Sequence, residues 1–130
     1  MDMQSDLNGR NLLNALEYLR RAIGKPRLEV QQMQLLLLLS LYPEGIAMQN
    51  AARELDVDPS LVSRNVKAFG PAGDGPHLIQ QQIDFQNPRQ RLVTLTPEGH
   101  KILKMLHEVI AGTKKAPELP PVLDKRKLGQ

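Results

Sequence analysis

The most constraining feature of this 130-residue sequence is a four-residue break between two short helical patterns. Apolar residues before the break recur on one helix face: Met48, Ala51, Ala52 and Leu55. The break itself consists of Asp56, Val57, Asp58 and Pro59. Asp58 is a good N-cap and Pro59 suits a first helical position, so a second helix is predicted from about Pro59 to Phe69.

The two faces of the predicted helix 59–69 differ in chemistry. Its apolar residues gather on one side: Val62, Val66 and Phe69. The opposite side carries small polar and cationic residues: Ser60, Ser63, Arg64 and Lys67. Small residues let a helix enter the major groove of DNA, where arginine bonds guanine and lysine meets phosphate. The pattern indicates a helix-turn-helix, and an ordinary amphipathic helix with a solvated face is the alternative.

Two strand-like segments follow at residues 78–84 and 91–95, around a turn-rich tip. Arg89 and Arg91 lie at or near the end of this predicted hairpin. A hairpin directly after a recognition helix is a wing, and its arginines can reach the adjacent minor groove or the DNA backbone. A surface hairpin with two solvated arginines is the alternative interpretation.

A run of five consecutive leucines within residues 29–41 predicts a helix that is buried on most sides. A buried strand is the competing interpretation of any short apolar run. The helix is favoured because the glutamines that precede the leucines show no period-two alternation.

The first and last predicted helices carry apolar stripes that are candidates for a dimer interface. The first helix spans about residues 8–23, with Asn8 or Ser5 as its N-cap, and the last spans 97–112, after Thr96 as its N-cap. The candidate interface residues are Leu12, Leu16, Leu19, Ile23, Leu106, Val109 and Ile110. So broad a stripe on the first helix suggests packing both within its own domain and against a second subunit, and packing within the monomer alone is the alternative.

Composition narrows the classes of function. The chain has no cysteine, which excludes disulfides, thiolate metal sites and cysteine catalysis. Its longest strongly apolar run, Leu35 to Leu41, is far shorter than the ~20 residues of a membrane span. Its polar N-terminus does not resemble a secretory signal. We therefore expect a cytoplasmic protein with no membrane partner.

Charge and titratable residues indicate a binding protein rather than an enzyme. The net charge of +3 lies entirely after Gly112, where five basic and two acidic residues occur, so a nucleic-acid surface would be a local patch on a neutral body. His100 and His107 lie two helical turns apart, roughly 10 Å along the axis, which is too far for one metal ion. We expect no catalytic residues, no metal and no cofactor. The basic run 125–127 is more often a solvated end than a DNA contact.

Two segments of the sequence resemble the MarR (multiple-antibiotic-resistance regulator) family of winged-helix regulators. The first is ARELDVDPSLVSR at residues 52–64, and the second is Asn87-Pro88-Arg89 followed by LVTLTPEG at residues 92–99. The resemblance covers about residues 29–110. It implies a winged-helix fold and a homodimer that binds a roughly palindromic operator in double-stranded DNA, usually as a repressor.

The resemblance also implies roles for individual residues. By position, the residues expected in the major groove are Ser60, Ser63, Arg64 and Lys67, and Arg89 matches the wing arginine of the family. Asp56 stands where the family turn usually has glycine, and aspartate tolerates a left-handed conformation better than most residues, so we expect the turn to form. Asn87 replaces the acid of the wing. The link at 70–76 is longer than usual, which leaves room for the wing to shift relative to the groove.

These observations predict a mainly α fold with a small β-hairpin wing. We expect an N-terminal dimerisation helix (1–28), a winged helix-turn-helix region (29–96), a C-terminal dimerisation helix (97–112) and a disordered basic, proline-rich tail (113–130).

Two functions stay open: a dimeric, sequence-specific DNA-binding repressor, and a winged-helix module that contacts polymerase or a replication factor. The acid-free face around Arg64 and Lys67 favours DNA. Many relatives are released by small molecules, but the sequence contains no charged pocket signature for such an effector.

Overall fold

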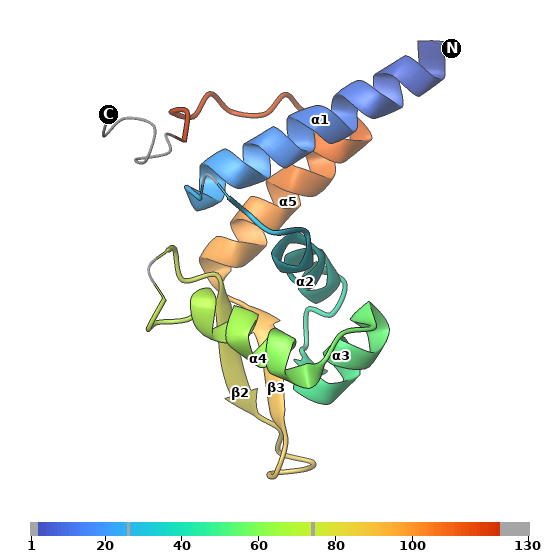
Figure 1. Cartoon of the computed structure of the whole chain (residues 1–130). Coiled ribbons are helices and arrows are strands. Elements are labelled where there is room, and N and C mark those ends of the chain that lie inside the picture. Colours follow the sequence, from blue (N-terminus) through green and yellow to red (C-terminus); the bar gives the residue numbers. More distant parts are fainter. Residues whose placement is uncertain (1–2, 26, 74, 123–130) are drawn as a thin grey trace. The chain divides into compact units, whose positions relative to one another are not determined.

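The computed structural model describes residues 3–25, 27–73 and 75–122. In chain order its elements are α1 (Met3–Ile23), α2 (Val30–Ser40), β1 (Ile46–Ala47), α3 (Met48–Leu55), α4 (Pro59–Ala68), β2 (Ile79–Ile83), β3 (Arg91–Leu95) and α5 (Pro97–Ala111) (Figure 1). The chain divides into two compact units. The winged-helix unit spans residues 29–103, and the helical unit combines the described parts of residues 1–28 and 104–130, so α5 runs through both.

Helix α2 confirms that the five-leucine run is helical rather than extended. Glu29 is its N-cap, and the backbone N–H of Glu29 donates to Oε1 of Gln32 at 3.2 Å. Four of the leucines are buried: Leu35, Leu36, Leu38 and Leu39. Because α2 packs against α3, α4 and β3, these leucines form a central part of the core of the winged-helix unit.

Helix α3 ends as the sequence predicts, with a left-handed aspartate. Asp56 has φ 54° and ψ 50°. The N–H of Asp56 donates to the carbonyl of Arg53 at 3.3 Å, and the N–H of Val57 donates to the carbonyl of Ala52 at 3.0 Å. This is the hydrogen-bond pattern of a Schellman motif, in which glycine is the usual left-handed residue. The turn therefore forms without glycine.

Helix α4 begins with the predicted Asp58 cap and Pro59 at its first position. The Asp58 carboxylate accepts hydrogen bonds from the backbone N–H of Ser60 at 2.8 Å and from the Ser60 hydroxyl at 2.7 Å. The sharp end of α3 and this immediate cap confine the connection to three residues, so α3 and α4 form the predicted helix-turn-helix.

A three-stranded antiparallel sheet in the order β1-β3-β2 carries the predicted hairpin. Strands β2 and β3 pair with Ile79 opposite Leu95 and Ile83 opposite Arg91. Strand β1, which pairs Ile46 with Val93, was not predicted. Two residues are too short to show the alternation by which a strand is recognised in a sequence.

The segment that follows the long link at 70–76 is hydrogen-bonded to the C-terminal end of α4. The carbonyl of Phe69 accepts hydrogen bonds from the N–H groups of Leu78 at 2.8 Å and Ile79 at 3.1 Å. Strand β2 therefore starts directly beside the end of α4 (Figure 1).

The start of α5 is fixed by the predicted Thr96 cap. Thr96 Oγ1 accepts from the N–H of Gly99 at 3.1 Å and donates to the carbonyl of His77 at 2.7 Å. A Cβ atom on Gly99 would lie 2.4 Å from the carbonyl oxygen of Leu78, so this close approach requires glycine. One hydroxyl thus joins the end of the link, the end of the sheet and the start of the helix.

In the helical unit, α1 begins at Met3 rather than at about residue 8, so the prediction of Asn8 or Ser5 as its N-cap was wrong. The additional first turns carry exposed polar side chains, and Gln4 Nε2 donates to Asn8 Oδ1 at 2.9 Å within them. Apolar periodicity cannot detect such turns. None of the described helices is long and apolar enough to span a membrane.

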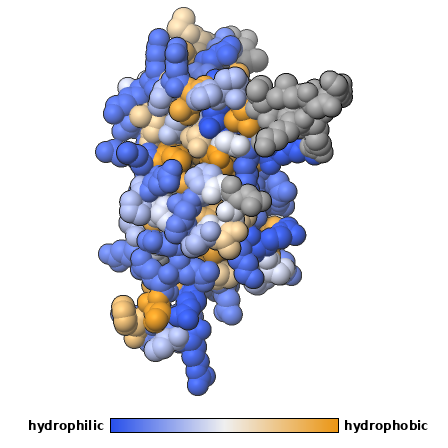
Figure 2. Space-filling model, turned by 90° about the vertical axis from the view of Figure 1, so that its left-hand side faces the viewer, coloured by the Kyte–Doolittle hydropathy of each residue, from blue (hydrophilic) through white to orange (hydrophobic). Residues whose placement is uncertain are grey.

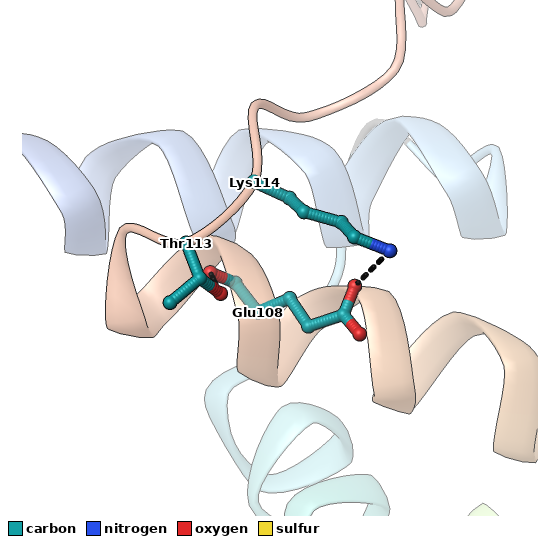
Figure 3. A network of polar contacts seen from close by, with 3 residues as sticks. All are labelled: Glu108, Thr113 and Lys114. Carbon is teal, nitrogen blue, oxygen red and sulfur yellow. Dashed lines mark hydrogen bonds and ion pairs between the residues drawn. The ribbon is translucent and has the colours of Figure 1, made fainter.

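Helix α5 ends in a second Schellman motif. Gly112 has φ 77°, its N–H donates to the Val109 carbonyl at 3.1 Å, and the N–H of Thr113 donates to the Glu108 carbonyl at 3.0 Å. The Lys114 ammonium forms an ion pair with the Glu108 carboxylate at 3.2 Å, which Figure 3 marks with a dashed line. The Thr113 hydroxyl also donates to the Glu108 carbonyl, at 3.2 Å. Described residues after Lys115 form no helix or strand, and the basic run 125–127 lies outside the described part of the chain.

Candidate nucleic-acid interface

Helix α4 buries its predicted apolar face and exposes its predicted polar face. Val62, Val66 and Phe69 are at most 2 % exposed. On the other side, Ser63 is half-buried, and the exposed residues are Ser60, Arg64 and Lys67. Since the buried side chains fix the rotation of the helix, the polar side chains are held outward.

A groove of about 430 Å³ lies between the start of α4, the start of α3 and the tip end of the hairpin. Four of the six predicted DNA-binding residues line it: Ser60, Ser63, Arg89 and Arg91. The other lining residues are Ala47, Met48, Gln49, Pro59 and Gln90. Among all these described lining residues none is acidic, so the electrostatic character of the groove is set by its two arginines.

Sequence reasoning missed Gln49 and Gln90 as part of this groove. Glutamine carries no charge, and neither residue belongs to an apolar pattern, so composition gave no reason to select them. Their amide groups can nevertheless donate and accept hydrogen bonds, as amides do when they recognise adenine edges. Their positions are the signal that could have found them. Gln90 lies between the two predicted wing arginines, Arg89 and Arg91, and Gln49 follows Met48 at the start of α3.

The two remaining predicted residues lie elsewhere on α4. Arg64 is exposed four residues after Ser60, which places both on one helix face. Lys67 lines a separate hollow of about 350 Å³, together with residues of the link and strand β2 such as His77 and Gln80. The structure therefore gathers four predicted residues in one groove and places the other two along the same helix.

The cations of this surface have no partner within the described part of the chain. The side chains of Arg64, Lys67, Arg89 and Arg91 make no hydrogen bond or ion pair with another described residue. Lys114 in the helical unit, in contrast, pairs with Glu108. Unpaired guanidinium and ammonium groups keep their hydrogen-bond donors available for an anion such as phosphate.

The N-cap of α4 restricts what Ser60 can do. The hydrogen bonds from the Ser60 hydroxyl and backbone N–H hold the pKa of the Asp58 carboxyl below its usual value. Because the Ser60 hydroxyl already donates its proton to Asp58, its oxygen is left to accept a hydrogen bond. Ser60 is therefore suited to base edges that present a donor, such as the amino groups of adenine and cytosine.

The tip of the hairpin consists of two consecutive turns. The N–H of Asn87 donates to the Asp84 carbonyl at 3.0 Å, and the N–H of Gln90 donates to the Asn87 carbonyl at 2.9 Å. Pro88 and Arg89 occupy the centre of the second turn, where proline favours the required backbone angle. The second turn therefore fixes the backbone that carries Arg89.

The seven candidate interface residues divide into two groups. Four are at most 3 % exposed and belong to the core of the chain itself: Leu19, Ile23, Leu106 and Val109. The other three are exposed by 39 % or more: Leu12, Leu16 and Ile110. Leu7 and Leu13 extend the exposed apolar surface of α1. Only the exposed group is available for a second subunit.

No cluster of three or more His, Cys, Asp or Glu side chains suited to a metal ion occurs among the described residues. Neither a protein-family model nor a curated protein matches the sequence. Solved structures do share its architecture, which is a winged helix-turn-helix.

The structural relatives are MarR-family winged-helix regulators. MepR of S. aureus in complex with DNA matches with a TM-score of 0.62 and 19 % identity over 85 % of this chain and 82 % of that chain. FabT of Streptococcus pneumoniae in complex with DNA matches with a TM-score of 0.58 and 18 % identity over 85 % and 75 %. RV1404 of Mycobacterium tuberculosis matches with a TM-score of 0.65 and 20 % identity over 81 % and 67 %. The resemblance predicted from two short segments is confirmed at the level of the fold.

Proposed function

We propose that this protein is a sequence-specific, double-stranded-DNA-binding regulator that represses transcription as a homodimer. The observation that carries the proposal is the acid-free groove in which Ser60 and Ser63 of α4 meet Arg89 and Arg91 of the hairpin. The structural relatives MepR and FabT, which share this fold, have been solved in complex with DNA.

Each element has a separate task in the proposed complex. Helix α4 enters the major groove, where Arg64 bonds a guanine and the two serines permit close approach. Lys67 meets backbone phosphate near the C-terminal end of α4. The wing at 84–92 contacts the adjacent backbone or minor groove through Arg89 and Arg91.

The proposed dimer uses the exposed part of the apolar stripes in the helical unit. Leu12, Leu16 and Ile110 would lose water contact when two copies meet, and this burial supplies the driving force for association. A two-fold dimer presents two copies of α4, which predicts a palindromic site whose halves lie about 34 Å apart, one turn of DNA. An operator that overlaps a promoter would be closed to polymerase when the dimer occupies it.

The test is selection of duplexes by the wild-type protein from a pool of random 30-base-pair DNA, followed by fluorescence anisotropy at two salt concentrations. We expect a palindromic site bound at least about a thousandfold more tightly than random duplex, with a steep salt dependence. Weak binding that salt abolishes and that selects no sequence would contradict the proposal. That result would favour the alternative, a winged-helix module that contacts polymerase or a replication factor.

A further inference from the structure

The hairpin tip carries an apolar group that the proposed contacts do not use. The chain has two phenylalanines: Phe69 is 0 % exposed in the core, whereas Phe85 is 93 % exposed at the tip. Ile83, at the end of strand β2, is 51 % exposed. Figure 2 shows hydrophobic atoms at the lower end of the molecule, the level of the β2–β3 tip in Figure 1, directly beside hydrophilic atoms.

The sheet register relates this apolar tip to the groove. Ile83 lies directly opposite Arg91, and strand alternation places this pair on the same sheet face as the buried Val93 and Leu95. Arg91 lines the groove beside α4. The sheet face that is buried at Val93 and Leu95 therefore carries, toward the hairpin tip, an exposed pair of one apolar residue, Ile83, and one cation, Arg91.

The backbone around Phe85 is held in place before any partner binds. The turn closed by Asp84 and Asn87 has Phe85 and Gln86 at its centre. The Asp84 carboxylate also accepts a hydrogen bond from the Gln86 N–H at 3.0 Å. A side chain on such a turn loses less conformational entropy on binding than one on an unstructured loop.

We propose that Phe85 is a minor-groove wedge that inserts at a base-pair step outside the bases read by α4, with Arg89 and Arg91 bound to the flanking phosphates. This inference rests on the proposed DNA-binding function and assigns the wing an apolar contact in addition to its cationic ones. Apolar wedges partly unstack a base step and kink the duplex toward the major groove. Because the wedge requires the duplex to kink, we expect the protein to prefer DNA sites with flexible base-pair steps such as TA or CA at that position.

The first test compares Phe85 variants on the duplex that the wild-type protein selects. Phe85→Ala is expected to weaken binding by about tenfold and to reduce the bend of a duplex labelled at both ends for energy transfer. Phe85→Leu should retain part of both effects, because leucine also serves as a wedge. The dependence of affinity on salt should stay unchanged for both variants, whereas Arg89→Ala should lower its slope by about one.

The second test places a fluorescent probe at the tip. The chain has no tryptophan, so Phe85→Trp introduces a single reporter. Insertion predicts that its emission is quenched by stacking on the bases and shielded from acrylamide in the complex. Because position 85 is exposed, all three Phe85 variants should unfold at the wild-type denaturant concentration.

The outcomes separate the wedge from the function on which it rests. The wedge would be overturned, and the regulator left intact, by two results together. The Phe85→Ala variant would bind and bend DNA as the wild type does, and the tryptophan of Phe85→Trp would stay accessible to acrylamide on DNA. Failure of the wild-type protein to select any duplex would overturn both. Shielding of the tryptophan only by an added protein partner would also overturn the wedge, since the tip would then be a protein-docking site.

Discussion

The two units of this chain differ in where they bury and where they expose large apolar side chains. In the winged-helix unit, large side chains such as Phe69 and Leu36 are fully buried, and Asp58 and Thr96 cap the helices that begin there. In the helical unit, α1 leaves Leu12 about half exposed. The large apolar side chains that the winged-helix unit exposes lie on separate elements, such as Leu41 after α2 and Phe85 at the hairpin tip, whereas Leu12, Leu13 and Leu16 recur along the single helix α1. A set of exposed leucines along one helix is typical of an interaction surface.

We propose that this contrast reflects different tasks of the two units in the proposed regulator. A DNA-reading surface requires a rigid scaffold, and the winged-helix unit supplies one with its own core and its own caps. The proposed dimer requires apolar surface that remains uncovered in the single chain, and the exposed leucines of α1 are the candidates for it. The same residue type, leucine, is therefore mostly buried in α2 and mostly exposed in α1, where Leu19 is the buried exception.

The largest expected effect is loss of the winged-helix core. Phe69→Ala removes a ring that is 0 % exposed, and we expect it to lower the free energy of unfolding by about 3–5 kcal/mol. Phe85→Ala is the matched control, since its ring is 93 % exposed, and it should leave the unfolding free energy unchanged. Urea denaturation measures both. Equal losses for the two variants would show that the tip is as much a part of the core as the end of α4.

The next largest effect tests whether the exposed leucines of α1 form the dimer interface. The double substitution Leu12→Lys and Leu16→Lys should raise the dimer dissociation constant by at least about a hundredfold, or about 2.8 kcal/mol. Sedimentation equilibrium measures this constant. Leu41→Lys is the control, because Leu41 is 66 % exposed in the winged-helix unit. A dimer that survives the double substitution but dissociates with Leu41→Lys would show that the interface lies on the winged-helix unit and not on the helical unit.

Two glycine substitutions sharpen the comparison further. Gly99→Ala would bring a Cβ atom to 2.4 Å from the Leu78 carbonyl oxygen, and we expect a loss of about 1–3 kcal/mol in unfolding free energy. Gly9→Ala in α1 meets no atom within 4 Å and should instead raise helix stability by about 0.5–1 kcal/mol. Thermal unfolding followed by circular dichroism distinguishes the opposite signs. A stabilising Gly99→Ala would mean that the start of α5 is not packed against Leu78.

The smallest expected effect depends on pH and on Asp58. The hydrogen bonds from Ser60 lower the pKa of this carboxyl in the folded state, so the charged cap stabilises the fold above the usual aspartate pKa of about 4. That contribution is lost as the pH falls through the lowered folded-state pKa. Asp58→Asn keeps a capping side chain without the charge.

The thermal midpoint of wild type should therefore exceed that of Asp58→Asn near neutral pH, and the difference should vanish in acid. A difference that does not change with pH would mean that the charge of Asp58 plays no part in the cap. Ser60→Ala, which removes the hydroxyl donor, should shrink the same difference.

Local signals in the sequence predicted most of the winged-helix unit. The left-handed Asp56, the Asp58 cap and the Thr96 cap each depend on residues within a few positions, and all three are confirmed. Strand β1 was missed because its partner Val93 lies far along the chain and two residues carry no period. The start of α1 was misplaced because the positions that would continue the apolar stripe before Leu12, which are Ser5 and Asn8, are polar.

The site was harder to predict than the fold. Periodicity indicates which residues are apolar on one face, but it does not say what covers them, so Leu12 and Leu19 were assigned to the same interface although one is exposed and the other buried. The groove brings α4 and the hairpin together across the link, and this juxtaposition depends on the hydrogen bonds from Leu78 and Ile79 back to Phe69. Residues such as Gln90 become candidates only when that arrangement is known.

The most direct test of DNA reading by α4 compares two arginines. Arg64→Ala and Arg10→Ala each remove one positive charge from an exposed position, one on α4 and one on α1. On the selected duplex and its single-base-pair variants, anisotropy should show that Arg64→Ala weakens binding by about 1–3 kcal/mol and loses discrimination at one base pair, while Arg10→Ala keeps it. Equal effects of the two substitutions, with discrimination intact in both, would contradict the reading of DNA by helix α4.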